Sequence, residues 1–197
     1  MILGNGSLMR IAPLLFMFRN QEPEVRLIVT KKVSAITHAH IRSVIACTYY
    51  LEFALLLAEG RNKFVAYREL QMELPTFLVR NLIDEREIAY FDRLFKGDIY
   101  NLPEAEIAST GYVVHTLEAS IWCILNTDCY RDAVLCAVNL GEDTDTTAAV
   151  TGALAGLLYG VYGIPDEWIQ KLARKEDIEE LAVRLARKMD EGWGYLW

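Results

Sequence analysis

Apolar side chains recur at helical spacing along nearly the whole chain, and this periodicity constrains the fold more than any other feature. No two β-branched runs are joined by an Asn-Gly type of turn, so the sequence offers no convincing β-hairpin. We therefore expect an all-α protein, a multi-helix globule rather than a slender four-helix bundle. The predicted helices span residues 24–34, 42–59, 62–80, 84–95, 112–125, 131–140, 147–162, 165–174 and 178–189. Pro75 is expected to kink or end the third of these, and Asp177 to cap the last.

Length, composition and charge favour one domain spanning residues 1–197. The chain has 197 residues, of which 53% are hydrophobic, which is enough for a real core but short for two full domains. Its formal net charge is −7, which argues against nucleic acid or an anionic membrane as the main partner.

The compartment is inferred from what the chain lacks. No apolar run approaches the length of a membrane span, and residues 1–5 carry no signal-type leader, so we expect a cytoplasmic protein without a membrane partner. The cysteines fall on apolar segments without Cys-x-x-Cys spacing. We expect them to be buried, reduced thiols without chemistry: Cys47, Cys123, Cys129 and Cys136.

The most specific polar segment is Gly141-Glu142-Asp143-Thr144-Asp145-Thr146-Thr147, which precedes the small-residue run 148–156. Two carboxylates and a hydroxyl in the pattern Asp-x-Asp-Thr can converge on one hard cation, because magnesium, manganese and calcium prefer oxygen ligands. Asp143, Asp145 and Thr146 are therefore candidate metal ligands. The alternative is that Asp143 or Asp145 caps the following helix, with a neighbouring threonine sharing that role.

A glycine-rich loop lies near the start of the chain, in the stretch Gly4-Asn5-Gly6-Ser7-Leu8-Met9-Arg10. Its glycines let the backbone approach a ligand closely, Ser7 can cap the turn that follows, and Arg10 can meet a phosphate. An ordinary turn before a helix is the alternative.

Two other loops carry candidate binding residues, since amide groups at helix N-termini favour anions. His38 or His40 can hydrogen-bond a ribose or a phosphate, although an ordinary loop histidine is the alternative for His40. Tyr112 stands at a predicted helix start, where its ring suits stacking on a flat base, and the alternative is a core tyrosine.

Together these segments resemble the ADP-ribosylglycohydrolase family, in particular its dinitrogenase-reductase-activating type, whose members remove ADP-ribose from modified side chains. The resemblance implies an all-helical orthogonal bundle with a binuclear magnesium or manganese centre. It also implies hydrolysis of the glycosidic bond at the anomeric carbon of ADP-ribose. The matching motifs are Gly4-Asn5-Gly6-Ser7-Leu8-Met9-Arg10-Ile11-Ala12-Pro13, Thr37-His38, Gly111-Tyr112-Val113-Val114 with Thr116-Leu117-Glu118-Ala119, and Gly141-Glu142-Asp143-Thr144-Asp145-Thr146.

The resemblance assigns roles to single residues. The metal ligands are Asp143, Asp145 and Thr146, of which the two aspartates are also the candidate catalytic residues. Because Asp145 lies between the two other ligands, we expect it to be the residue shared by both ions. The loop of Gly4, Asn5, Gly6 and Ser7 contacts the diphosphate, His38 contacts the ligand, and Tyr112 lies near the adenosine. His115 replaces an aspartate that is commoner in the family, a change that we expect to be tolerated.

Members of this family begin with a long segment that supplies an acidic residue and a Thr-Asp-Asp set to the metal centre. Here only three residues precede the glycine-rich loop, so we expect an N-terminally truncated fold whose cations lack part of their usual six oxygens. Three functions stay open. The first is an ADP-ribosyl hydrolase, either completed by a separate N-terminal chain or cut short as a gene product. The second is a catalytically incompetent ADP-ribose-binding module, and the third is a helical remnant that self-associates through exposed apolar surface.

Overall fold

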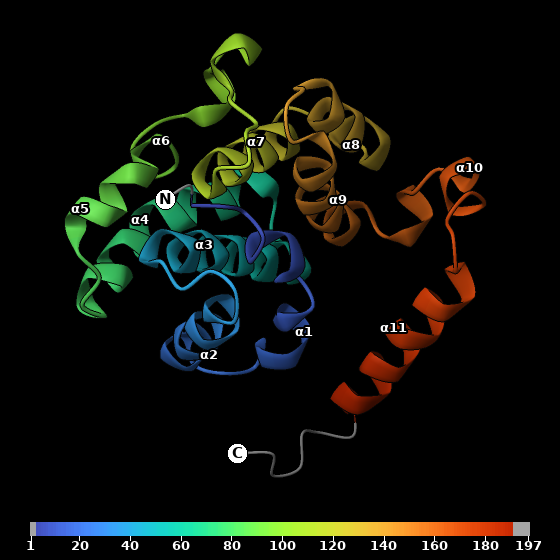
Figure 1. Ribbon diagram of the computed structural model, residues 1–197, viewed down its shortest axis with the longest axis horizontal. Helices are drawn as coiled ribbons and strands as arrows, with labels where there is room; N and C mark the ends of the chain where they lie inside the picture. Colours follow the sequence, from blue (N-terminus) through green and yellow to red (C-terminus); the bar gives the residue numbers. More distant parts are fainter. Residues whose placement is uncertain (1–2, 191–197) are drawn as a thin grey trace. The chain divides into compact units, whose positions relative to one another are not determined.

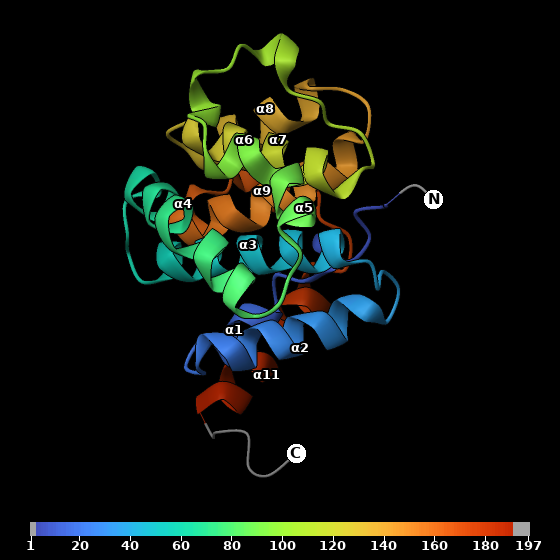
Figure 2. The same ribbon diagram turned by 90° about the vertical axis from the view of Figure 1, so that its left-hand side faces the viewer.

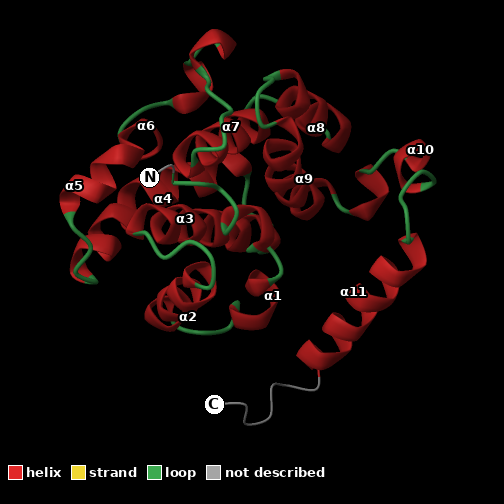
Figure 3. Cartoon of the chain, in the orientation of Figure 1, coloured by secondary structure: helices red, strands yellow, loops and turns green. Residues whose placement is uncertain are grey.

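The computed structural model describes residues 3–190, and the chain divides into two compact units, one up to residue 163 and one from residue 164. Within the described range the regular structure is helical (Figure 3). Extended pairing there is limited to one isolated bridge between Gly4 and Tyr112. The all-α prediction is therefore confirmed, whereas the single-domain prediction stays a prediction.

The first unit carries all the candidate site residues. Short 3₁₀ turns join its helices at Leu8–Arg10, Ala89–Phe91, Ile99–Asn101, Glu104–Glu106 and Val161–Gly163. The helices are α1 (Leu14–Phe18), α2 (Pro23–Ala35), α3 (Ile41–Ala58), α4 (Lys63–Arg80), α5 (Glu85–Ile88), α6 (Asp92–Phe95), α7 (Val113–Leu125), α8 (Tyr130–Asn139) and α9 (Thr144–Tyr159), as Figure 1 shows.

Helix α3 runs through the middle of this unit, with α1 and α2 on one side and α7 and α9 on the other (Figures 1 and 2). By length and composition alone α3 could cross a membrane, so the expectation that no apolar run approaches such a length is wrong. However, 67% of α3 is buried inside the fold, and the core helix of a folded domain passes the same test. Its apolar character is accounted for by packing on several faces.

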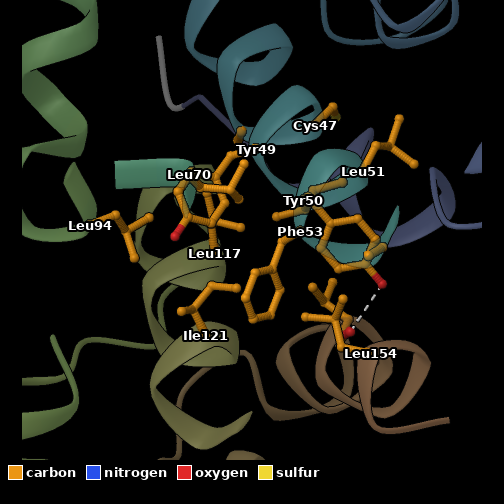
Figure 4. Packing of buried hydrophobic residues seen from close by; sticks show 14 of the residues in the cluster. Cys47, Tyr49, Tyr50, Leu51, Phe53, Leu70, Leu94, Leu117, Ile121 and Leu154 are labelled. Atoms are coloured by element: carbon orange, nitrogen blue, oxygen red, sulfur yellow. Dashed lines mark hydrogen bonds between the residues drawn. The ribbon is translucent and has the colours of Figure 1, made fainter. Parts of the chain in front are cut away.

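The core of the first unit fixes the starts of α7 and α9. Figure 4 shows Phe53 of α3 between Ile121 of α7 and Leu154 of α9, and none of the three side chains is exposed. Tyr50 of α3 donates a hydrogen bond from its hydroxyl to the carbonyl of Val150 in α9 at 3.2 Å. Because α7 and α9 are held against the same central helix, the loops that precede them are brought to one region of the unit.

Pro75 does not end a helix at its position, because α4 continues through it to Arg80. A proline in a helix interior costs about 3 kcal/mol through its missing N–H and the clash of its ring. The helix nevertheless buries Leu70, Leu74 and Leu78, and each buried leucine contributes about 1.5–3 kcal/mol. Burial on both sides of the proline therefore exceeds the cost of the lost hydrogen bond.

The single helix predicted over residues 84–95 is divided into α5, a 3₁₀ turn and α6. Ile88, Phe91 and Leu94 are spaced by three residues and are all buried. A 3₁₀ turn has three residues per turn, so it aligns side chains at this spacing on one face. The tertiary contacts of these three residues thus override the longer helical pattern.

The second unit contains α10 (Asp166–Ile169) and α11 (Lys175–Asp190) in its described part. The first of these helices is shorter than the predicted 165–174, and the second begins before the predicted start at residue 178. Asp177 is therefore not the cap of α11. It lies in the first turn and accepts a hydrogen bond from Arg174 Nε at 2.6 Å.

Candidate functional site

Three loops that are far apart in the sequence meet at one place in the first unit. The amide of Asn5 donates to the carbonyl of Gly111 at 3.1 Å, and the amide of Asp143 donates to the carbonyl of Ser109 at 3.1 Å. Ser109 also donates from its hydroxyl to the carbonyl of Gly141 at 2.6 Å. The glycine-rich loop, the loop before α7 and the acidic turn before α9 are therefore joined by backbone hydrogen bonds.

The side chain of Asn5 makes the most direct connection between the candidate binding loop and the candidate metal ligands. Its Nδ2 atom donates to Asp143 Oδ2 at 2.6 Å and to Thr116 Oγ1 at 2.8 Å. Asn5 is 8% exposed and Thr116 is fully buried, so water competes little for either bond. The carboxylate of Asp143 consequently faces the glycine-rich loop.

The glycines of the loop pack against the imidazole of His38. A Cβ atom on Gly4 would lie 3.1 Å from His38 Nε2, so no larger residue fits there without a shift of the ring. The other ring nitrogen, Nδ1, is 2.7 Å from the hydroxyl of Thr37. The backbone of His38 is held as well, since its carbonyl accepts from the hydroxyl of Ser34 at 2.9 Å. The structure thus brings the predicted residues Gly4, Gly6 and His38 into direct contact.

Ser7 differs from the expectation that it caps the turn, whereas the phosphate contact expected of Arg10 stays a prediction. Ser7 makes no capping hydrogen bond, because its side chain is fully buried and its hydroxyl accepts from the Cys47 thiol at 3.6 Å. Burial raises the pKa of Cys47 to about 11. The exposed guanidinium of Arg10 donates a hydrogen bond to the carbonyl of Gly6 at 2.6 Å, which stabilises the backbone of the loop. Any contact of Ser7 with a ligand would therefore come from its backbone.

Of the candidate metal ligands, Asp145 and Thr146 lie in the first turn of α9 and Asp143 lies directly before it. Asp143 is the residue before the helix and is half-buried, but its carboxylate makes no capping bond to the helix amides. Asp145 is exposed, and its Oδ1 accepts from the amide of Thr146 at 2.9 Å. Gly141 and Glu142 both have positive φ angles, of +82° and +55°, which turn the chain sharply into α9.

The donors of this turn suit a hard cation in chemistry, although they make up only part of a coordination shell. Asp143 and Asp145 offer carboxylate oxygens, and Thr146, which is 7% exposed, offers a hydroxyl. Among residues 3–190, no group of three or more His, Cys, Asp and Glu side chains is placed to hold a metal ion. Further oxygens would have to come from water or from another segment.

Tyr112 stands at the start of α7 within a cluster of charged and aromatic groups. Arg42 donates from Nη1 to its hydroxyl at 3.4 Å and forms an ion pair with Glu87 at 2.6 Å. The guanidinium of Arg42 also lies over the ring of Tyr90, 3.4 Å from the centroid. The ring of His115 meets Tyr112 edge to face at 5.0 Å. Tyr112 is half-buried, so its ring is partly accessible beside the glycine-rich loop.

A model of the ADP-ribosylglycohydrolase family matches residues 2–194 of this chain. The chain belongs to the ADP-ribosylglycohydrolase family. The ADP-ribosylarginine hydrolase Tri1 of Serratia proteamaculans is 35% identical over 182 residues, which cover 92% of this chain and 46% of that protein. The ADP-ribosyl-[dinitrogen reductase] glycohydrolase of Rhodospirillum rubrum is 28% identical, with 89% of this chain and 53% of that protein covered.

A solved structure of an ADP-ribosylglycohydrolase-related protein complex superimposes with a TM-score of 0.78 at 30% sequence identity. The match covers 94% of this chain and 60% of that one. This likeness confirms the predicted ADP-ribosylglycohydrolase-like helical fold. The chain spans about half the length of the curated relatives named above.

With the family shown, two residues that sequence reasoning did not single out stand out near the site. Thr116 lies within one of the family motifs, yet only the fold reveals that its hydroxyl accepts a hydrogen bond from the Asn5 side chain. Nothing in the sequence pattern indicated a functional role for Arg42, because an arginine at the start of an apolar helix is common. Its contact with Tyr112 spans 70 residues of sequence. His40, by contrast, serves as the cap of α3, with Nδ1 accepting from the amide of Arg42 at 3.2 Å.

Helix α7, which begins directly after Tyr112, also carries a buried carboxylate. Glu118 is 3% exposed and forms an ion pair with Arg93 of α6 at 3.2 Å. Burial raises the pKa of Glu118 to about 7, and Arg93 offsets part of that effect. Burial, together with the charge of Arg93, also lowers the pKa of His115, whose Nδ1 is 2.8 Å from the hydroxyl of Thr110.

The expectation of four buried thiols holds for two of them. Cys47 and Cys123 are buried, but Cys136 is half-buried and Cys129 is exposed. Cys129 is the residue before α8, where its sulfur accepts from the amide of Asp132 at 3.4 Å. The apolar residues around Cys129 in the sequence therefore did not decide its burial.

Proposed function

We propose that this chain carries an ADP-ribose site and takes part in hydrolysing the glycosidic bond between ADP-ribose and an arginine side chain. The observation that carries the proposal is the 2.6 Å hydrogen bond between Asn5 and Asp143, which joins a glycine-lined loop to an acidic turn. Tri1, which is 35% identical over most of this chain, is an ADP-ribosylarginine hydrolase, and this supports arginine as the acceptor. The dinitrogenase-reductase-activating type has weaker support, at 28% identity.

The ligand would lie along the three joined loops. The backbone of residues 4–7 can approach a diphosphate closely, since two of its four residues are glycines packed on His38. His38 presents its Nε2 side to this loop and can hydrogen-bond a ribose or phosphate oxygen. Tyr112 offers the face of a half-buried ring for the adenine base. The anomeric carbon would then lie toward the acidic turn.

Asp143, Asp145 and Thr146 would hold Mg²⁺ or Mn²⁺ in this proposal, with Asp145 shared where two ions bind. The ions would supply Lewis-acid chemistry and orient a water molecule and the ribose hydroxyls. The contribution of the chain itself is to fix Asp143 against the loop and to present Asp145 at the surface of the first turn of α9. Both aspartates are therefore proposed as catalytic residues.

Calorimetric titration with ADP-ribose, in EDTA and in Mg²⁺, tests the proposal on the whole chain. We expect binding that strengthens with Mg²⁺, and we expect Asp145→Ala to remove that strengthening. Asp166→Ala, an exposed aspartate of α10, is the matched control and should behave like the unaltered chain. Release of ADP-ribose from an ADP-ribosylarginine peptide in Mg²⁺ or Mn²⁺ measures hydrolysis directly. No heat with ADP-ribose under either condition would overturn the proposal.

A second candidate is an ADP-ribose-binding module that turns over nothing. It is favoured by one observation, that residues 3–190 contain no convergent group of three or more His, Cys, Asp and Glu side chains. In that case ADP-ribose binds with equal affinity in EDTA and in Mg²⁺, and the peptide stays intact. Addition of a separately expressed N-terminal half from a family member would restore release if the hydrolase needs a second segment.

A further inference from the structure

We infer that Asn5 is a positioning residue, which fixes the carboxylate of Asp143 rather than contacting the ligand with its own side chain. The inference rests on the proposed function and concerns how the glycine-rich loop and the acidic turn act together. The two residues are 138 positions apart in the sequence, and their hydrogen bond, at 2.6 Å, is short for a nitrogen donor and a carboxylate oxygen.

Every N–H hydrogen of Asn5 is already used inside the protein. The side-chain amide gives one hydrogen to Asp143 Oδ2 and the other to Thr116 Oγ1. The backbone amide donates to the carbonyl of Gly111 at 3.1 Å. A phosphate oxygen accepts hydrogen bonds and needs a donor, so it would have to displace one of these three bonds. Asn5 is therefore a poor phosphate ligand in this conformation.

The orientation of the amide follows from its partner. An ionised carboxylate is an acceptor only, so the group of Asn5 that faces Asp143 must be the NH₂ group. Thr116 fixes that group from the other side, because its hydroxyl accepts from Asn5 and can donate to the carbonyl of Thr110 at 3.2 Å. Donation therefore runs outward from the Asn5 amide, to Asp143 on one side and through Thr116 to the carbonyl of Thr110 on the other.

This arrangement places a charge-assisted hydrogen bond on one oxygen of the half-buried Asp143. Hydrogen bonds to charged groups are stronger than those between neutral groups, and loss of one changes an equilibrium constant by about tenfold or more. Without it, the carboxylate of a half-buried residue at a helix start has several rotamers available. Asn5 therefore selects the orientation in which Asp143 faces the glycine-rich loop, and this carboxylate is one of the three side chains that would hold the proposed cation.

The test compares the affinity for ADP-ribose in EDTA with the affinity in Mg²⁺, both measured by calorimetry. For Asn5→Ala we expect the gain in affinity on adding Mg²⁺ to fall by about tenfold, with affinity in EDTA changed less than about threefold. Mn²⁺ affinity of the ligand-free chain, read by electron paramagnetic resonance, should weaken in the same variant. Asn62→Ala is the control, since it removes the cap of α4 and destabilises the protein away from the site.

The outcomes separate this inference from the proposed function. If the unaltered chain does not bind ADP-ribose, or binds it without any effect of Mg²⁺, the proposed metal-dependent site is wrong and the role of Asn5 is wrong with it. If Mg²⁺ strengthens binding and Asn5→Ala keeps that gain, the inference alone is overturned. It is also overturned if Asn5→Ala loses affinity equally in EDTA and in Mg²⁺, because Asn5 would then contact the ligand or hold the whole loop. An equal loss of the Mg²⁺ gain in Asn62→Ala would show that lower stability, rather than position, is the cause.

Discussion

A Cβ atom on Gly6 would lie 2.6 Å from Cε1 of the His38 ring, closer than side-chain atoms pack in folded proteins. Gly4 makes a similar but looser approach to the same ring. From the sequence alone, the two glycines are explained by the close approach of a ligand. The structure adds a second reason, which is that the imidazole of His38 occupies the space that a side chain would need.

Gly6→Ala should therefore displace His38 and weaken both the fold and the ADP-ribose site. We expect a loss of about 1–3 kcal/mol in the free energy of unfolding, as for other overpacked positions, and a weaker calorimetric affinity for ADP-ribose. Gly156→Ala is the matched control, because a Cβ there meets nothing within 4 Å and alanine favours a helix. If Gly6→Ala lowers the free energy of unfolding by the same amount in a His38→Ala background, then the clash with His38 is not the cause of the destabilisation.

The buried carboxylate of Glu118 should make stability depend on pH. Its pKa is raised to about 7 in the folded protein, so the folded chain keeps a proton that the unfolded chain releases near pH 4.5. The free energy of unfolding should consequently fall as pH rises from about 4.5 to about 7, by up to about 3 kcal/mol, and then level off. Urea unfolding at several pH values measures this slope.

Glu118→Gln should flatten that slope, because glutamine does not titrate and Arg93 is exposed enough to stay hydrated. Glu24→Gln, at an exposed position of α2, is the control and should leave the slope unchanged. Equal slopes in the unaltered chain and in Glu118→Gln would contradict the assignment.

Substitution of Tyr112 should separate recognition of the base from recognition of the phosphates. Tyr112→Leu removes the ring and should weaken ADP-ribose binding about tenfold, since base–aromatic stacking contributes about 1–3 kcal/mol. Tyr112→Phe keeps the ring and loses only the long contact with Arg42, so we expect a smaller effect. Ribose 5-phosphate, which lacks the base, should bind all three proteins alike. If Tyr112→Leu weakens the binding of ADP-ribose and of ribose 5-phosphate equally, a base-stacking role is contradicted.

Replacement of Pro75 by alanine should stabilise the protein. The substitution restores an N–H group inside α4 and removes the ring that crowds the preceding turn. We expect the free energy of unfolding to rise by about 1–2 kcal/mol in urea titrations, less than the full helical cost of proline because the unfolded chain gains freedom. Pro103→Ala is the contrasting variant, since Pro103 has a φ of −66° outside a helix and its loss should be neutral or destabilising.

Sequence patterns predicted the helical class and most helix positions, because the spacing of apolar residues reports directly on which face of a helix is buried. They failed at α5 and α6, where the burial of Ile88, Phe91 and Leu94 tightened the chain into a 3₁₀ turn. The start of α9 was also misplaced: the helix begins at Thr144, directly after Asp143, and not at residue 147. The site assignments, the metal and the cytoplasmic location stay predictions.

The sequence by itself determined that this protein is helical and that Asp143, Asp145 and Thr146 belong to one short segment of four residues. Only the tertiary structure decided that Asp143 faces Asn5, that Ser7 is buried against Cys47, and that His38 fills the space beside Gly6. Each of these contacts joins segments separated by tens of residues or more. Their geometry depends on how α2, α7 and α9 pack around α3, and helical periodicity specifies which faces are buried without specifying which partners they meet.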